Sequence, residues 1–197
     1  PAQLDAFRDK WRIDPKDEVI GFVGRLGAEK NLDMLIPAME IVAKKRPKAR
    51  LVYVGDFDHK EVLEASAAAS TCPDRITFTG ALQREKLGVA YAAMDVFVFP
   101  SLTDTQGWVV HEAALAGLPL VLIDTEVSEI VVPGENGMYA GNTPEDMAKV
   151  LIELLSSPKK RESFGKESQK LARRFTERRQ VSKLAKLYED VVANYDK

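Results

Sequence analysis

The fold is decided by one stretch of the sequence, Asp95-Val-Phe-Val-Phe-Pro-Ser-Leu-Thr-Asp104-Thr-Gln-Gly107-Trp-Val-Val-His-Glu112-Ala-Ala-Leu-Ala-Gly117-Leu-Pro119. It opens with an apolar run typical of a buried strand and continues into a polar loop that holds Asp104. Gly107 opens a helical pattern that carries a second carboxylate, Glu112, and Gly117 and Pro119 end it. A strand, a polar loop and a helix N-terminus favour an anion site, and the carboxylates beside it favour hydroxyl groups on the same ligand.

The composition describes an ordinary globular protein. The 197 residues, 45% of them hydrophobic, are enough for one full-sized domain with a sizeable core. A net charge of −2 gives no support for nucleic-acid binding, and a single cysteine, Cys72, cannot form an internal disulfide. No apolar stretch approaches the roughly 18 residues of a membrane span, and no signal peptide opens the chain. We therefore expect a cytoplasmic location.

Strand and helix patterns alternate along the chain. Apolar segments predict strands at 19–24, 50–55, 76–80, 95–99, 120–123 and, after a turn at 134–137, in a short sixth segment. Helical patterns lie at about 31–45, 60–70, 83–94, 107–117 and 143–156. This alternation predicts βαβ units, and hence an α/β fold with a Rossmann-like parallel sheet of about six strands and helices on both faces.

We expect a single domain over residues 1–197, with an incoming helix at 1–17, the Rossmann-like core at 18–156 and C-terminal helices at 157–197. The start in the middle of a helical pattern suggests a cut inside a longer protein. The C-terminal helices are basic, through Lys159, Lys160, Arg161, Lys166, Lys170, Arg173, Arg174, Arg178, Arg179, Lys183 and Lys186. This pattern is typical of a solvated face, or of a face turned to an acidic membrane surface, here the inner one.

Arg25 and Lys30 flank a glycine-containing loop between the first strand and its helix. A guanidinium can bind phosphate oxygens through two hydrogen bonds, and an ammonium adds a mobile point charge. Gly24 and Gly27 allow the backbone to come close to a ligand. Taken alone, the two cations are equally consistent with an ordinary surface loop. Because ligands of such sheets bind beyond the carboxyl ends of the strands, we expect Arg25, Gly80 and Asp104 to converge there.

A nicotinamide dinucleotide site is disfavoured. The glycines of Gly21-Phe-Val-Gly24-Arg-Leu-Gly27 do not have the spacing of the dinucleotide fingerprint. Asp56 follows the second strand, but it lies farther along the chain than the roughly 20 residues that the fingerprint requires.

Residues 18–156 resemble the nucleotide-sugar-binding C-terminal domain of GT-B glycosyltransferases of family 4, the "group 1" retaining enzymes. The resemblance is carried by six ordered motifs: Gly24-Arg-Leu-Gly-Ala-Glu-Lys-Asn31, Val54-Gly-Asp56, Phe78-Thr-Gly80, Tyr91-Ala-Ala-Met-Asp-Val-Phe-Val-Phe-Pro-Ser101, Gly107-x4-Glu112-Ala-Ala-Leu-Ala-Gly-Leu-Pro119 and Glu129-Ile-Val-x-x-Gly134-x-Asn-Gly137. The family's E-x7-E signature is similar to Asp104-x7-Glu112.

The resemblance implies a role for each matching residue. Arg25 and Lys30, with Gly24 beside them, would bind the donor's diphosphate and stabilise the leaving nucleoside diphosphate. Glu112 would hold the ribose hydroxyls and Asp104 would face the donor sugar. The backbone around Gln106, Gly107 and Trp108 would meet sugar and phosphate oxygens, and the loop of Gly80, Ala81 and Leu82 would contact the base. The resemblance also implies transfer without a metal ion or other cofactor.

Two positions depart from the family pattern. Asp104 is one methylene shorter than the usual glutamate, and Asp124-Thr-Glu-Val-Ser stands where the family often has a glycine pair. The segment Thr-Asp-Thr-Gln-Gly, residues 103–107, is similar to Thr-Glu-Thr-Gln-Gly of some glycolipid-forming members, which hints at a lipid acceptor.

The remaining reactive side chains do not suggest a second site. We expect His111 to serve packing or the surface and His59 to be exposed. No His, Cys and Asp spacing matches a metal cluster, and Cys72 has no activating neighbour in the sequence.

The resemblance therefore implies the donor-binding half of a retaining glycosyltransferase that would move a hexosyl group from a nucleoside-diphosphate sugar, such as a UDP- or GDP-sugar, to an acceptor hydroxyl. The acceptor, a glycan or glycolipid, would bind an N-terminal half that this chain does not include, so the chain alone would bind nucleotide but transfer little. Two alternatives stay open: a non-catalytic nucleotide-binding module, and a nucleotide-sugar epimerase of related two-domain architecture.

Overall fold

The computed structural model describes residues 2–175 and 177–195. The side chain of Arg178, one of the predicted basic residues, lies outside the described part.

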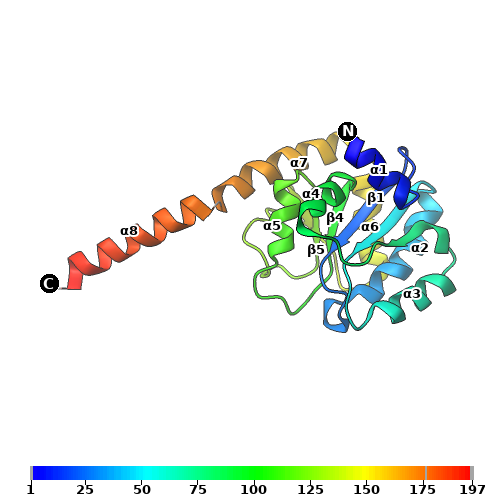
Figure 1. Cartoon of the computed structure of the whole chain (residues 1–197), viewed down its shortest axis with the longest axis horizontal. Coiled ribbons are helices and arrows are strands. Elements are labelled where there is room, and N and C mark those ends of the chain that lie inside the picture. Colours follow the sequence, from blue (N-terminus) through cyan, green and yellow to red (C-terminus); the bar gives the residue numbers. More distant parts are fainter. Residues whose placement is uncertain (1, 176, 196–197) are drawn as a thin grey trace.

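A six-stranded parallel sheet forms the centre of the molecule (Figure 1). Its strands are β1 (Glu18–Val23), β2 (Ala49–Val54), β3 (Ile76–Phe78), β4 (Val96–Phe99), β5 (Leu120–Leu122) and β6 (Gly137–Tyr139). They are arranged in the order β3-β2-β1-β4-β5-β6, with every neighbouring pair parallel. The predicted Rossmann-like sheet is thus confirmed. The order of connections reverses between β1 and β4, so the carboxyl ends of these two strands form the switch point at which such sheets bind ligands.

Helices cover both faces of the sheet. They are α1 (Ala2–Lys10), α2 (Leu35–Lys45), α3 (Lys60–Ala69), α4 (Arg84–Ala92), α5 (Trp108–Leu115) and α6 (Pro144–Leu155). Helix α2 packs beside α6, while α1 packs beside α4. Helix α6 begins as its sequence predicts, because the Thr143 hydroxyl accepts a hydrogen bond from the Asp146 amide at 3.1 Å and Pro144 occupies the first turn.

The core is built from the two faces of the sheet. Strands β1 and β4 are buried along nearly their whole length, which explains why their sequences are continuously apolar and do not alternate. Phe22 and Phe99, on these neighbouring strands, stack with ring centroids 6.1 Å apart. Burying side chains of this size stabilises the fold by about 1.5–3 kcal/mol each.

The predicted start of the second helix at residue 31 is wrong. Asn31 adopts a left-handed conformation, with φ of 56°, and two short 3-10 turns, Ala28–Lys30 and Leu32–Met34, precede α2. The Asn31 side chain donates hydrogen bonds to the Pro100 carbonyl at 3.2 Å and to the Asn142 side chain at 2.9 Å. These long-range contacts hold the backbone away from the helical conformation that the apolar pattern predicts.

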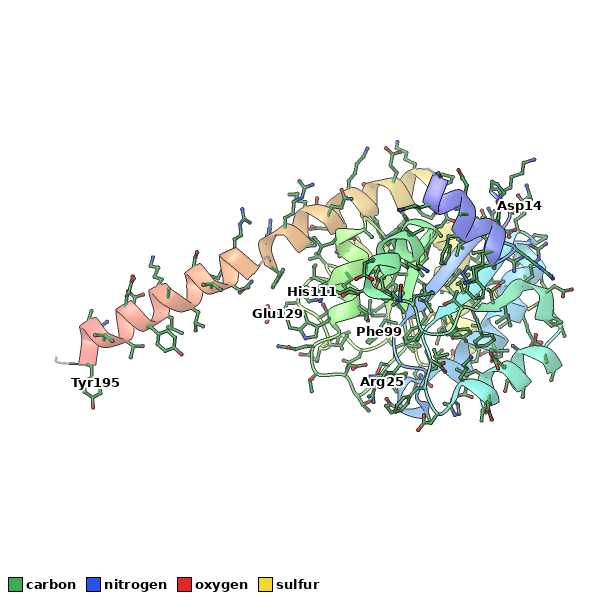
Figure 2. All side chains as sticks on the ribbon, in the orientation of Figure 1. Asp14, Arg25, Phe99, His111, Glu129 and Tyr195 are labelled. Atoms are coloured by element: carbon green, nitrogen blue, oxygen red, sulfur yellow. The ribbon has the colours of Figure 1, made fainter. Side chains whose placement is uncertain are left out.

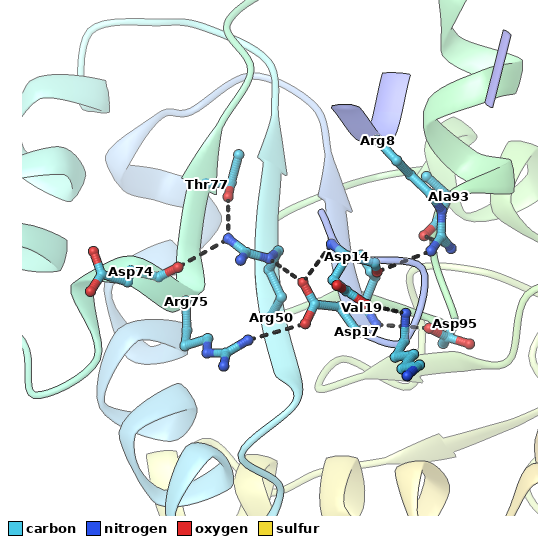
Figure 3. Close-up of polar contacts among 11 residues, drawn as sticks. Arg8, Asp14, Asp17, Val19, Arg50, Asp74, Arg75, Thr77, Ala93 and Asp95 are labelled. Atoms are coloured by element: carbon cyan, nitrogen blue, oxygen red, sulfur yellow. Dashed lines mark hydrogen bonds and ion pairs between the residues drawn. The ribbon is translucent and has the colours of Figure 1, made fainter. Parts of the chain in front are cut away.

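A charged cluster ties the amino ends of three strands together (Figure 3). Asp17 is buried before β1 and accepts hydrogen bonds from Arg50 of β2 at 2.9 Å and from Arg75 at 3.1 Å. Arg50 also donates to the Asp74 carbonyl and the Thr77 hydroxyl beside β3. Because both carboxylate oxygens of the buried Asp17 accept a hydrogen bond from an arginine, we interpret this cluster as a structural clamp at the edge opposite the switch point.

The two C-terminal helices are α7 (Pro158–Ala172) and α8 (Glu177–Tyr195), joined by the 3-10 turn Arg173–Phe175. Helix α7 packs on α5, and the buried Ser168 hydroxyl donates to the Leu118 carbonyl at 2.8 Å. Several of the predicted basic residues are ion-paired with glutamates, among them Lys160, Lys166 and Lys170.

Helix α8 leaves the body of the molecule and ends at Tyr195, far from the sheet (Figures 1 and 2). One set of its side chains is apolar and exposed, namely Val181, Leu184, Leu187, Tyr188, Val191, Val192 and Tyr195. Within the described residues, this apolar stripe has no protein surface against it.

Candidate functional site

A cavity of about 230 Å³ lies at the switch point, beyond the carboxyl ends of β1 and β4. It is lined by Phe22, Gly24, Arg25, Lys30, Phe99, Asp104, Thr105, Gln106, Gly107, Trp108 and Val109. The cavity therefore brings together seven of the predicted site residues: Gly24, Arg25, Lys30, Asp104, Gln106, Gly107 and Trp108. Four others, Glu112, Gly80, Ala81 and Leu82, do not line it.

Two loops form one wall of this cavity, and hydrogen bonds connect them. The loop after β1 contributes Glu29, whose carbonyl accepts a hydrogen bond from the Thr103 hydroxyl at 3.4 Å. The bond from Asn31 to the Pro100 carbonyl connects the same loops a second time. The two loops are thus held as one unit, although their residues lie some 70 positions apart in the sequence.

The strongest connection is an ion pair between Lys30 and Asp104. The Lys30 ammonium lies 2.7 and 2.8 Å from the two carboxylate oxygens of Asp104. The side chains are only 12% and 22% exposed, so solvent screens the pair less than it screens a surface pair. The predicted phosphate cation and the predicted sugar-facing carboxylate are therefore direct partners.

Arg25 is held differently and lies at the edge of the body (Figure 2). Its guanidinium donates to Glu29 at 3.1 Å and lies over the Phe57 ring, 4.8 Å from the centroid. The side chain is 60% exposed, and an exposed pair of this kind contributes little to stability. The Arg25 guanidinium is therefore free to exchange Glu29 for an anionic ligand at small cost.

The N-terminus of α5 opens onto the cavity. Gly107 precedes the helix in a left-handed conformation, with φ of 43°, which favours glycine. Helix α5 carries unpaired N–H groups and the positive end of its dipole at this point, so the cavity combines two cations with a helix terminus. Such a combination binds anions, whereas Asp104 and the side chain of Gln106 can accept hydrogen bonds from hydroxyl groups.

Glu112 lies on α5 beside α4, outside the cavity. One of its carboxylate oxygens, Oε2, accepts a hydrogen bond from the Tyr91 hydroxyl at 2.8 Å. Tyr91 belongs to one of the six predicted motifs, but no role was predicted for it from the sequence. The sequence places Tyr91 in the helix before β4. Because this helix must pass α5 on the same face of the sheet, a contact between Tyr91 and α5 could have been predicted.

The loop predicted to contact a base also lies outside the cavity. Gly80 forms a bridge with Gly55, whose amide donates to the Gly80 carbonyl at 3.1 Å. Ala81 is exposed and Leu82 is half-buried. This loop follows β3, the outermost strand on its side of the sheet, two strands away from β1.

A second cavity, of about 390 Å³, adjoins the first across Trp108. Its walls include His111 and the Glu126–Glu129 segment, whose first three residues belong to the predicted departure after β5 and whose last residue opens the sixth predicted motif. The His111 ring lies between Trp108 and Phe175, with centroid distances of 5.9 and 5.3 Å, so of the two predicted roles, packing or the surface, the structure supports packing. Burial lowers the pKa of His111, against an opposing contribution from the Gly107 backbone.

The predicted exposure of His59 is wrong. Its Nε2 atom lies 2.8 Å from an Asp33 carboxylate oxygen, and only 19% of the side chain is exposed. This contact joins the start of α3 to the 3-10 turn before α2, a pairing across 26 residues that no local pattern predicts.

Comparison with known proteins identifies the family. The family model described as "Glycosyl transferases group 1" matches residues 4–171. The chain belongs to the group 1 glycosyl transferases. The predicted resemblance is thereby confirmed.

Curated relatives support the same family. The chain is 34% identical to sulfoquinovosyl transferase SQD2 of Arabidopsis thaliana over 176 residues, which cover 87% of this chain and 33% of that protein. It is 31% identical to alpha-monoglucosyldiacylglycerol synthase of Acholeplasma laidlawii over 157 residues, covering 79% of this chain and 39% of that protein. The group 1 chain described here thus spans about a third to two fifths of the length of these relatives.

Solved structures show the same fold. Anabaena Alr3699/HepE in complex with UDP superimposes with a TM-score of 0.84 at 22% identity, over 96% of this chain and 53% of that one. Sucrose-phosphate synthase of Thermosynechococcus elongatus gives a TM-score of 0.83 at 24% identity, over 98% of this chain and 49% of that one. At this level of identity, the likeness establishes the GT-B half as the architecture.

The described residues contain neither a candidate metal cluster nor a candidate membrane-spanning helix. No group of three or more His, Cys, Asp or Glu side chains in that part is placed to hold a metal ion. In the same part, no helix is both long and apolar enough to cross a membrane.

Proposed function

We propose that this chain is the nucleotide-sugar-binding part of a retaining glycosyltransferase, which transfers a hexosyl group from a nucleoside-diphosphate sugar to an acceptor hydroxyl. Membership of the group 1 family supports the transferase class. A solved neighbour that contains UDP supports a uridine nucleotide as the first donor to test, with GDP as the alternative.

The observation that carries the proposal is the meeting of Lys30 and Asp104 in the switch-point cavity, at the N-terminus of α5. A nucleotide sugar carries a diphosphate and several hydroxyl groups, so its recognition needs cations and hydroxyl acceptors within one short cleft. The cavity offers both, together with the unpaired N–H groups of a helix. Few other ligand classes need all three.

We assign roles by this chemistry. Lys30 and Arg25 bind the diphosphate and stabilise the negative charge that develops on the leaving nucleoside diphosphate. Asp104 accepts hydrogen bonds from the donor sugar, and Glu112 from the ribose. Because two cations compensate the charge of the leaving group, transfer is proposed to need no metal ion.

The backbone of Gln106, Gly107 and Trp108 completes the proposed sugar and phosphate contacts, and Gly24 allows the diphosphate to approach the backbone of the first loop. The loop of Gly80, Ala81 and Leu82 is proposed to contact the base beyond the cavity, at the neighbouring strand end.

The acceptor is proposed to be a glycan or glycolipid that binds residues beyond this chain. The name of the Acholeplasma relative includes a diacylglycerol product, which supports a lipid acceptor. The exposed apolar stripe of α8, flanked by Arg179, Lys183 and Lys186, supports a peripheral contact with the cytoplasmic face of a membrane. Because acceptor binding would require further residues, we expect the chain alone to bind donor without appreciable transfer.

The proposal is tested by calorimetric titration of UDP, GDP, ADP and dTDP into the wild-type chain and into Arg25→Ala and Lys30→Ala. Losing one charge-assisted phosphate contact costs about 1.5–3 kcal/mol, so each variant is expected to bind the preferred nucleotide about 10- to 150-fold more weakly. Lys48→Ala is the matched control, because it removes an exposed cation at the amino end of β2. The absence of binding by all four nucleotides, or equal weakening by Lys48→Ala, would refute the assignment.

A second candidate, a non-catalytic nucleotide-binding module, is favoured by one observation. Both Asp104 oxygens already accept from Lys30, which leaves fewer of the carboxylate's lone pairs available to a sugar. Asp104→Glu in the longer enzyme separates the two candidates. Improved transfer supports the transferase, whereas transfer absent from both the wild type and the variant supports the module.

A further inference from the structure

Tyr91 of α4 makes a contact that its place in the core does not require. The residue is 3% exposed, and its ring packs against Phe97 of β4 with centroids 6.1 Å apart. Its hydroxyl nevertheless reaches across to α5 and donates to Oε2 of Glu112 at 2.8 Å. The buried Tyr91 is thus hydrogen-bonded to the exposed Glu112, the carboxylate that is proposed to bind the ribose hydroxyls.

The direction of this hydrogen bond is fixed. Burial raises the pKa of Tyr91 far above its ordinary value, and the Glu112 carboxylate raises it further. The phenol therefore keeps its proton at neutral pH and acts as a donor. Its other contact, to the Val109 carbonyl, is long, at 3.5 Å, so Glu112 is the principal acceptor.

The contact divides the Glu112 carboxylate into one occupied and one open oxygen. Oε2 accepts from Tyr91, whereas Oε1 has no hydrogen-bond partner among the described residues. A glutamate on an exposed helix face would otherwise sample several rotamers. Tyr91 selects one of them, because the ring that carries the hydroxyl is itself immobilised in the core.

We propose that Tyr91 is a positioning residue that orients Glu112 toward the ribose hydroxyls and so sets the preference for ribonucleotides over deoxyribonucleotides. This inference rests on the proposed function, which places a nucleoside diphosphate at the carboxyl edge of the sheet. Tyr91 itself does not touch the ligand. A purely structural tyrosine would stabilise the fold without affecting which sugar the nucleotide carries.

The test measures the binding of UDP, GDP and ADP, each beside its 2′-deoxy and 3′-deoxy analogues, by calorimetry. Tyr91→Phe removes the hydroxyl and keeps the ring. We expect this variant to bind the preferred ribonucleotide about 5- to 10-fold more weakly than wild type does. Its affinity for at least one of the deoxy analogues should stay within about twofold of the wild-type affinity. Glu112→Ala should abolish the preference for the ribonucleotide over its deoxy analogues. Adding Tyr91→Phe to Glu112→Ala should cause no further change in this preference.

Tyr53→Phe is the matched control. Tyr53 is also fully buried, and its hydroxyl donates to the Leu32 carbonyl at 3.1 Å, so the variant loses a comparable hydrogen bond away from Glu112. It should leave the ratio of ribonucleotide to deoxyribonucleotide affinity unchanged.

The outcomes separate this inference from the proposed function. If Glu112→Ala abolishes the preference while Tyr91→Phe retains it, or if Tyr91→Phe weakens all analogues equally, the role of Tyr91 is overturned and the nucleotide site stands. If no ribonucleotide binds the wild-type chain, the proposed function falls and this inference falls with it.

Discussion

Replacing Asp104 with asparagine is expected to strengthen the binding of a free nucleoside diphosphate. In the structure the Lys30 ammonium is 2.7 and 2.8 Å from the two Asp104 oxygens, inside the cavity proposed for the diphosphate. Asp104 thus neutralises the cation that would bind phosphate, and its negative charge repels the same ligand. Asparagine keeps the size of the side chain and removes the charge.

The size of the expected gain in affinity follows from the separation between the Asp104 carboxylate and a bound phosphate. A phosphate about 6 Å from the Asp104 carboxylate is repelled by about 1–2 kcal/mol at an effective dielectric constant between that of a protein surface and that of water. Removing this repulsion should tighten UDP binding about 5- to 30-fold. A UDP-sugar gains the same amount but loses its hydrogen bonds to the carboxylate, worth about 1.5–3 kcal/mol, so its advantage over UDP should shrink or vanish.

Calorimetric titration of UDP and UDP-glucose at low and high salt measures both effects. Asp5→Asn, an equal charge change on the exposed α1 helix, serves as the control. Weaker UDP binding by Asp104→Asn than by Asp5→Asn would refute the reasoning.

A thermodynamic cycle tests the ion pair independently of any ligand. Urea unfolding of Asp104→Asn, Lys30→Met and the double variant should give a coupling free energy of about 1–2 kcal/mol. This exceeds the usual value for exposed pairs because the side chains are only 12% and 22% exposed. A coupling below about 0.3 kcal/mol would mean that the pair is not formed in solution.

Two further predictions concern the scaffold. Gly55→Ala should lower the free energy of unfolding by about 3 kcal/mol or more, because Gly55 has φ of 148° and an added Cβ would lie 1.8 Å from the Gly24 carbonyl oxygen. Gly80→Ala, with φ of 69° and open space around the added Cβ, should cost about 1 kcal/mol in the same urea titration, and equal losses would contradict the steric argument. Burial raises the pKa of Asp95 above its ordinary value, against the opposing Val19 amide and the Arg161 and Arg8 guanidinium groups. The stability that Asp95 contributes is therefore fully present below its unfolded-state pKa and is lost as the pH rises through its native pKa. Asp95→Asn should become progressively more favourable relative to wild type as the pH rises above the ordinary aspartate pKa of about 4 in urea unfolding, and a difference independent of pH would contradict this.

The strands could be predicted from the sequence because their signal is local. A strand buried on both faces needs a continuous apolar run, and the runs around Phe22 and Phe97 can form nothing else at that length between turn residues. The helix patterns between them then leave a parallel sheet as the only arrangement with short connections. The start of α2 was predicted wrongly because Asn31 is held by residues 69 and 111 positions away.

The sequence predicted which residues belong to the candidate site, but it did not predict which of them contact one another. The sequence placed Lys30 and Asp104 at neighbouring strand ends. Their direct contact, however, depends on how far each of the two loops extends beyond the edge of the sheet. Tyr91 was missed for the same reason, since a hydroxyl on one helix meets Glu112 on another only once both helices lie on the sheet. Local patterns determine which residues reach the edge of the sheet, whereas three-dimensional packing determines which of them touch.

The connections between the two loops bear on how the site can change. Thr103 bonds to the backbone of Glu29, Asn31 bonds to the backbone of Pro100, and Lys30 pairs with Asp104 between them. The loop that carries the proposed phosphate cations therefore cannot move without the loop that carries the proposed sugar carboxylate. Because a carboxylate one methylene longer than Asp104 would place its charge farther along the cavity, a glutamate at this position would have to displace Lys30 or bend away from it. The identity of this one acidic residue thus sets the position of the cation as well as the reach toward the sugar.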